Sequence, residues 1–222
     1  MLVVAIDGPS GSGKSSTSRA VAAHFGWAYL DTGAMYRAMA WAWLQSGVPI
    51  EEADAVAAMV RGVSLEVGTD PAAPTIRVDV TDVTDAIREP EISSQVSKVS
   101  SIQRVRDDLI LRQRAVIEGA ADGIVVEGRD ITTVVAPHAE VRILLVADPG
   151  ARVARRAAEL GEKATGDQVT DQVIRRDADD AKVTTFTEAA DGVTVIDSTH
   201  DDLPTVVGRV VGLVEQALAG KP

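Results

Sequence analysis

The stretch Val3-Val4-Ala5-Ile6-Asp7-Gly8-Pro9-Ser10-Gly11-Ser12-Gly13-Lys14-Ser15-Ser16 decides the fold. A short apolar run leads into Gly-x-x-x-x-Gly-Lys-Ser, and a helical pattern follows at once, which is the P-loop motif in its strand–loop–helix setting. The glycines let the backbone approach an anion, so N–H groups of the loop and of the new helix converge on a phosphate. Lys14 is expected to meet the outer phosphates, and the Ser15 hydroxyl to bind Mg²⁺. The predicted nucleoside triphosphate site comprises Gly8, Pro9, Ser10, Gly11, Ser12, Gly13, Lys14, Ser15 and Ser16.

The composition is that of a folded protein of 222 residues, with 45% hydrophobic residues and no cysteine. A single large domain is the simplest reading of this length. The lack of cysteine excludes disulfides, thiolate catalysis and cysteine zinc sites. A net charge of −11 opposes nonspecific nucleic-acid binding, and no apolar run approaches the ~18 residues of a membrane span. We therefore expect a cytoplasmic protein with no nucleic-acid or membrane partner, whose local arginine clusters suit a small anionic substrate.

Strand-like and helix-like patterns alternate along the chain, which predicts an α/β protein. The nearly continuous apolar runs at 123–127 and 141–146 are typical of a parallel sheet covered on both faces. With 3–6, 27–30 and 193–196 they predict a five-stranded parallel sheet sandwiched by helices. Period-two alternation in 63–67 and 75–80 predicts a small inserted antiparallel sheet. Helices are predicted over 14–25, 33–46, 51–61, 91–99, 101–118, 149–160, 167–182 and 203–218, with a hinge at 161–166.

Two more motifs lie at the carboxyl ends of predicted strands, where ligands bind in open α/β sheets. Asp31-Thr32-Gly33-Ala34-Met35-Tyr36-Arg37 follows the second strand, and the guanidinium fork of Arg37 suits a second phosphate. Glu127-Gly128-Arg129-Asp130 ends another strand. The Glu127 carboxylate is placed to hold Mg²⁺, directly or through water. Charges such as Arg129 and Asp130 at a strand end beside a P-loop indicate function.

Together with Val105-Arg106, Thr133-Val134-Val135, Arg176-Asp177 and Asp180, these motifs resemble the bacterial cytidylate kinases, in the nucleoside monophosphate kinase group, over nearly the whole chain. The resemblance implies one P-loop nucleoside kinase domain over 1–222. Its region of about 63–104 would bind the monophosphate, and its region of about 156–182 would form a lid or hinge. The implied reaction is transfer of the γ-phosphoryl group of ATP, bound with Mg²⁺, to CMP or dCMP by a monomer.

The resemblance also implies a role for each matching residue. Lys14, Arg129, Arg155 and Arg156 would neutralise charge in the transition state, the last two from the lid side, and Ser15 and Glu127 would hold the metal. The implied CMP site comprises Thr32, Tyr36, Arg37 and Arg129 around the phosphate, Ser97, Arg106 and Asp130 at the cytosine, and Arg176 and Asp180 at the ribose.

Taken by themselves, several of these residues fit a plainer interpretation. Arg106 flanks an apolar helical stripe and fits a solvated arginine equally well. Arg176 and Asp180 are four residues apart on one predicted helix, and this spacing alone fits a surface ion pair better than a ribose site. The arginines at 112, 114 and 175 are expected to face solvent.

The chain also departs from the family pattern at two positions. Thr132 stands where glycine is common, and threonine would strain the turn by ~1–3 kcal/mol if the backbone there needs a positive φ. Val183 replaces a usual arginine that helps to read cytosine. The alternatives are therefore a kinase for UMP, AMP or a metabolite, or a nucleotide-binding relative with weak catalysis. A GTPase switch is disfavoured, because the chain has no guanine-reading Asn-Lys-x-Asp pattern.

Overall fold

The computed structural model describes residues 1–160, 170–181, 184, 186 and 188–220. Its main sheet has five parallel strands, as the sequence predicts, with the P-loop strand at the centre. Ile6 lies opposite Glu127 on one side and Ile143 on the other, so the polar strand ends meet at one edge. In spatial order the strands are β2 (Ala28–Asp31), β6 (Gly123–Gly128), β1 (Leu2–Asp7), β7 (Val141–Val146) and β8 (Thr194–Asp197).

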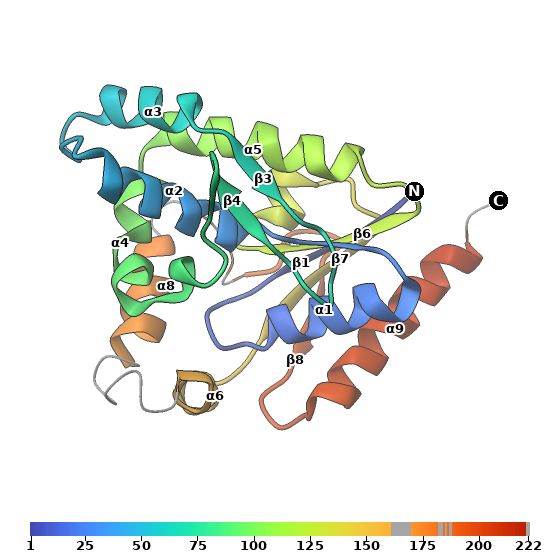
Figure 1. Cartoon of the computed structure of the whole chain (residues 1–222). Helices are drawn as coiled ribbons and strands as arrows, with labels where there is room; N and C mark the ends of the chain where they lie inside the picture. The colour runs from blue at the N-terminus through green and yellow to red at the C-terminus, as the bar shows by residue number, and fades with distance from the viewer. Residues whose placement is uncertain (161–169, 182–183, 185, 187, 221–222) are drawn as a thin grey trace.

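Helices cover both faces of this sheet (Figure 1). Val4 and Ile6 of β1 contribute to one buried cluster, with Val21 of α1 and Val210 of α9, while Ala5 contributes to the other. This division explains why the strands are almost continuously apolar. One face is covered by α1 (Lys14–Phe25) and α9 (Leu203–Ala219), and the other by α2 (Thr32–Ser46), α3 (Ala53–Gly62), α4 (Pro90–Ser100) and α5 (Gln103–Glu118).

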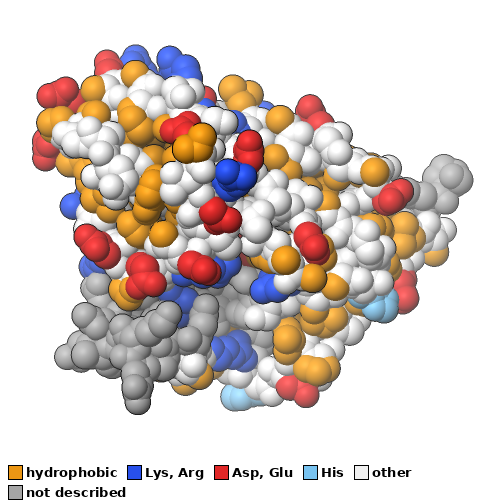
Figure 2. All heavy atoms as spheres, viewed as in Figure 1, with side chains coloured by type: hydrophobic (Ala, Val, Ile, Leu, Met, Phe, Trp, Pro, Cys, Tyr) orange, Lys and Arg blue, Asp and Glu red, His pale blue; other side chains and the backbone are white. Residues whose placement is uncertain are grey.

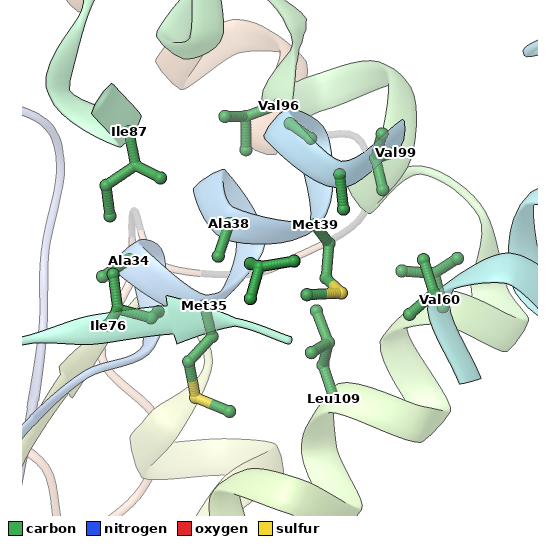
Figure 3. Packing of buried hydrophobic residues seen from close by; sticks show 14 of the residues in the cluster. Ala34, Met35, Ala38, Met39, Val60, Ile76, Ile87, Val96, Val99 and Leu109 are labelled. Carbon is green, nitrogen blue, oxygen red and sulfur yellow. The ribbon is translucent and has the colours of Figure 1, made fainter. Parts of the chain in front are cut away.

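The predicted insert is an antiparallel sheet that packs on α2. It contains one strand more than the sequence pattern indicates, a two-residue strand too short for a period-two signal. Figure 3 shows Ile76 beside Ala34 of α2, and Val96 and Val99 of α4 around Met39. The insert comprises β3 (Leu65–Val67), β4 (Ile76–Val78) and β5 (Thr81–Asp82), and the short helix η1 (Ala86–Arg88) leads on to α4.

Two segments differ from the predicted pattern. A π-helical turn, η2 (Ile131–Val135), follows β6, because the Asp7 carboxylate accepts the N–H groups of Ile131 and Thr132, both at 2.8 Å. After α6 (Pro149–Leu160), the described part of the predicted helix 167–182 contains a π-helical segment, η4 (Asp171–Arg175), and a short helix, α8 (Arg176–Asp180). The predicted hinge at 161–166 lies outside the described residues, as does Val183.

The expectation that Arg112 faces solvent is wrong. Its side chain is half-buried and donates to the carbonyls of Val63 at 2.8 Å and Val60 at 3.0 Å, which satisfies the C-terminal end of α3. Arg114 is exposed and donates to the Val134 carbonyl at 2.7 Å. On the face shown in Figure 2, acidic, basic and apolar side chains are interspersed. Among the described residues, no helix combines the length and apolar character needed to span a membrane.

Candidate active site

The phosphate-binding loop has the backbone geometry that its glycines permit. Gly11 has φ 75°, and a Cβ atom there would lie 2.6 Å from the Arg152 carbonyl oxygen. Gly13, also left-handed with φ 89°, precedes the first residue of α1, Lys14. The N–H groups of this first turn have no partners within the helix. Lys14 Nζ donates to the carbonyl of Pro9 at 3.3 Å, so the ammonium lies over its own loop.

A cavity of about 690 Å³ opens in front of this loop. The loop lines it, together with arginines from α2, α5 and the residue that follows β6. This volume is within the usual range of small-molecule sites. The sequence-predicted residues that line the cavity are Ser10, Gly11, Ser12, Gly13, Lys14, Ser15, Ser16, Thr32, Tyr36, Arg37, Arg106, Glu127, Arg129, Asp130, Arg155, Arg156 and Asp180.

Glu127 is buried at the centre of the strand edge. Its Oε2 accepts from the Ser15 hydroxyl at 2.9 Å, its Oε1 accepts from the Tyr29 hydroxyl, and its backbone carbonyl accepts from the Thr32 hydroxyl at 2.8 Å. Burial raises the pKa of Glu127 and the Asp31 charge adds to the rise, although Lys14 opposes it. The carboxylate is therefore held in place and costly to ionise until a cation approaches.

Asp31 and Arg37 form an ion pair at the first turn of α2. Asp31 Oδ1 accepts the Ala34 N–H at 2.9 Å as the helix N-cap, and Oδ2 accepts from Arg37 Nη2 at 2.8 Å. Burial acts to raise the pKa of Asp31, but Arg37, the Ala34 N–H group and Lys14 outweigh it and hold the pKa below its usual value. The buried Nε of Arg37 has no hydrogen-bond partner among the described residues, and the residue lines the cavity.

Arg106 and Asp130, which both line the cavity, form a buried ion pair. Each side chain is less than a tenth exposed. Arg106 is therefore not a solvated arginine, although its position on the helix would also fit one. Burial raises the pKa of Asp130, and Arg106 offsets the rise only in part. A buried donor–acceptor pair of this kind can read the polar edge of a planar ring.

Arg129 is held by several groups at once. Its Nη1 donates to the Gly8 carbonyl at 2.6 Å, its Nε to Asp180 at 3.1 Å and its Nη2 to Asp177 at 2.8 Å. The guanidinium carbon lies 4.5 Å from the centre of the Phe186 ring. The guanidinium is therefore fixed against the phosphate-binding loop while it still lines the cavity.

Arg155 and Arg156 of α6 also line the cavity. Arg155 Nη1 donates to the hydroxyl of Ser198 at 3.0 Å, and that hydroxyl donates in turn to the Ser12 carbonyl at 2.9 Å. Ser198 directly follows β8, so the strand-edge rule could have indicated it. Arg155 is thereby connected to the loop.

The described cavity lining leaves out some of the sequence-predicted residues and includes others that the sequence did not indicate. Ser97 is half-buried on α4 and is not among the described cavity-lining residues, whereas Ser93, Val96 and Ser100 of the same helix are. These three share a helical face at spacings of three and four, but serines at 93, 97 and 100 made the face ambiguous. Gly8 and Pro9 are likewise not among the described lining residues, and the Arg176 side chain lies outside the described part of the structure. Further lining residues that the motifs did not indicate include Arg88, Pro90, Thr184, Asp201 and Leu203.

Thr132 is not strained, because Asp79, with φ 50°, is the only non-glycine residue of the described chain with a positive φ. Its hydroxyl donates to Asp7 Oδ2 at 2.7 Å, alongside its own N–H group at 2.8 Å. The departure from glycine therefore adds a hydrogen bond to a buried carboxylate.

The fold and the site define a class, the P-loop kinases. Residues 4–216 match the family model described as cytidylate kinase, and the chain belongs to that family. It is 53% identical over 220 residues to the cytidylate kinase of Cutibacterium acnes, covering 98% of this chain and 97% of that one. It is 48% identical over 222 residues to the cytidylate kinase of Streptomyces coelicolor, with 99% and 95% covered. The crystal structure of TT1252 from Thermus thermophilus shares the fold, with a TM-score of 0.50 and 18% identity over 99% of this chain and 98% of that one.

Proposed function

We propose that this enzyme transfers the γ-phosphoryl group of ATP to CMP or dCMP, forming ADP and CDP or dCDP. The observation that supports it most directly is one cavity lined by two sets of anion-binding groups. The loop N–H groups and Lys14 form the first set, and Arg37 and Arg129 form the second. The buried Arg106–Asp130 pair lines the same cavity, where it could meet a pyrimidine attached to the acceptor phosphate.

The side chains have two tasks in this reaction, alignment and charge neutralisation. The acceptor phosphate is already anionic, so the reaction needs no general base. Lys14, Arg129, Arg155 and Arg156 neutralise the transferring group, while Thr32 and Arg37 hold the acceptor phosphate with Arg129. Arg106 and Asp130, with Tyr36 beside them, read the cytosine, and Asp180 meets the ribose together with Arg176. In place of Ser97, we include Ser93 and Ser100 in the cytosine side of the site.

Mg²⁺ accompanies ATP in this proposal. Ser15 Oγ and Glu127 Oε2 lie 2.9 Å apart, and hydroxyl and carboxylate oxygens are ligands that Mg²⁺ accepts. The described residues contain no group of three or more acidic or histidine side chains that could hold a metal, so phosphate oxygens and water would complete the coordination. When bound, the ion supplies charge neutralisation at the phosphates.

The regional roles are part of the same proposal. Arg88 of η1 and Ser93 of α4 line the cavity, which supports a monophosphate-binding role for the region of about 63–104. Arg156 and Asp180 line it from the region of about 156–182, which supports a lid role there. We further propose that the enzyme acts as a monomer in the cytoplasm.

The test is a comparison of initial rates with ATP and four acceptors, CMP, dCMP, UMP and AMP. We expect kcat/KM for CMP or dCMP to exceed that for UMP and AMP by at least about tenfold, because a site built to hydrogen-bond one ring edge leaves polar groups unpaired with another. Preference for UMP or AMP would assign the chain to another acceptor. Binding of ATP without single-turnover formation of CDP would identify a catalytically weak relative.

A further inference from the structure

Two charged side chains that contact the cavity-lining Arg129 or the phosphate-binding loop, Asp177 and Arg152, have no part in the roles above. Asp177 belongs to α8. Its Oδ1 accepts from Arg129 Nη2 at 2.8 Å and from the Ser10 N–H group at 3.0 Å, and its Oδ2 accepts from Arg152 Nη1. The side chains of Asp177, Arg129 and Arg152 are 13%, 14% and 9% exposed. Contacts this well shielded are stronger than surface ion pairs.

Asp177 and Arg152 together hold the phosphate-binding loop at Ser10. Arg152 Nη1 also donates to the Ser10 carbonyl, at 3.0 Å, so the Asp177–Arg152 pair binds both backbone polar groups of Ser10. Gly11 follows directly, and its Cα is packed against the Arg152 backbone. The outer turn of the loop is therefore fixed to α6 and α8, which lie far from it in the sequence.

Asp177 is not itself among the described residues that line the cavity, whereas Ser10 and Arg129 are. Its carboxylate lies behind them and would act on a nucleotide only through them. Asp180, which does line the cavity, binds the Nε of Arg129, and Asp177 binds the Nη2. The two carboxylates thus fix the plane of the guanidinium from one side.

We propose that Asp177 is a positioning residue for phosphoryl transfer. It fixes the Arg129 guanidinium relative to the Ser10 turn of the loop and, through Arg152, relative to α6. This inference rests on the proposed function, since Arg129 is there assigned to the transferring phosphoryl group. Arg129 and the Ser10 turn of the loop meet at this carboxylate, so its loss would displace donor and acceptor relative to each other.

The primary test is Asp177→Asn, which keeps the side-chain shape and removes the charge. We expect kcat to fall by about 10- to 100-fold, because a misplacement on the order of 1 Å has this effect on an aligned reaction. The KM values for ATP and CMP should change by less than about threefold, since loop N–H groups, Lys14 and Arg37 still bind the ground-state phosphates.

Asp179→Asn is the matched control on the same helix. Asp179 pairs with Arg175 at 3.2 Å on the surface, where Arg175 is 48% exposed. This variant removes the same charge without touching the loop, and we expect its kcat to stay within about twofold of wild type. Equal losses of kcat in the two variants would overturn the proposal.

A double-mutant cycle separates positioning from a general structural effect. If Asp177 acts through Arg129, Asp177→Asn should lower kcat by less than about twofold in an Arg129→Ala background. Multiplicative losses would contradict the inference, as would wild-type kcat in a folded Asp177→Asn enzyme. If circular dichroism shows that Asp177→Asn does not fold, Asp177→Glu, which keeps the charge but moves the carboxylate away from Arg129, replaces it in the cycle with the same expected outcomes. An inactive wild type would count against the proposed function, whereas an active wild type with an unaffected Asp177→Asn would count only against the role of Asp177.

Discussion

Lys14 is the cation that the P-loop motif supplies, and its ammonium donates to the Pro9 carbonyl at 3.3 Å. It is positioned by the loop itself and can turn to a phosphate oxygen without any change of fold. Lys14→Ala should therefore lower kcat by roughly 10²–10³-fold, the usual effect of removing a group that stabilises developing charge. The unfolding midpoint should stay close to wild type. Steady-state rates with ATP and CMP, together with thermal unfolding, check both parts, and retention of most activity would remove Lys14 from the mechanism.

Thr132 gives a residue-scale prediction that concerns stability. Its hydroxyl and N–H group both donate to the buried carboxylate of Asp7, whose pKa burial raises. Thr132→Gly removes the hydroxyl and frees the backbone, so we expect the free energy of unfolding to fall by about 1–3 kcal/mol. Thr132→Ser keeps the donor and should lose less than half as much. Urea titrations of the three proteins measure the difference, and a glycine variant as stable as wild type would contradict this account.

Among the helices, α2 carries a titratable N-cap. Asp31 accepts from the Ala34 N–H group and from Arg37, and these contacts with Lys14 hold its pKa below the usual 3.8 despite burial. The pKa of Asp31 is lower in the folded state than in the unfolded state. Its contribution to stability is therefore complete above about pH 3.8 and disappears as the pH falls through the folded-state pKa. Asp31→Ala should lower the free energy of unfolding by about 1–3 kcal/mol at pH 7. The difference from wild type should shrink below pH 3.8.

The control is Asp31→Asn, which keeps an acceptor for the Ala34 N–H group and loses the charge. The free energy of unfolding of Asp31→Asn at pH 7 should lie between those of wild type and Asp31→Ala. Its stability should lack the change at acid pH that the Asp31 carboxylate contributes. Loss of the Asp31 charge also relieves Glu127, whose raised pKa it supports, so part of the cost is offset at neutral pH. Chemical denaturation between pH 3 and pH 7 tests this, and a constant difference between Asp31→Ala and wild type would contradict it.

At the scale of helices and strands, the sequence predicts those elements that a local pattern of residues determines. The five core strands follow from apolar runs and the insert from period-two alternation, because burial on two faces or one determines these patterns directly. The sequence does not predict the π-helical turn η2, because its residues, Ile131 to Val135, include several β-branched ones with low helix propensity. Its shape depends on Asp7, which is remote in sequence. The same applies to Arg106, whose burial depends on Asp130 from another element.

For the whole molecule, charge is distributed unevenly between surface and site. The chain carries a formal net charge of −11, yet six arginines and Lys14 line the cavity among its described residues. The P-loop and strand-end motifs predict Lys14, Arg37 and Arg129, because these places are fixed by pattern. The motifs also contain the carboxylates that hold the arginines, such as Asp177, but they do not predict which arginine each one binds, because most of these pairings form only when remote segments meet.

This distribution predicts how acceptor binding affects global unfolding. A phosphate at Arg37 and Arg129 would join α2 to the end of β6, so CMP should stabilise the folded chain by about 2.7 kcal/mol at 100 times its Kd. Cytidine at the same concentration should stabilise it far less, because it lacks the anion that these guanidinium groups bind.

Arg37→Ala should remove most of the effect of CMP. Arg114→Ala, which changes an exposed arginine outside the cavity lining, should preserve it. Thermal unfolding with each ligand provides the measurement. Equal shifts with CMP and cytidine would show that Arg37 and Arg129 do not bind the acceptor phosphate.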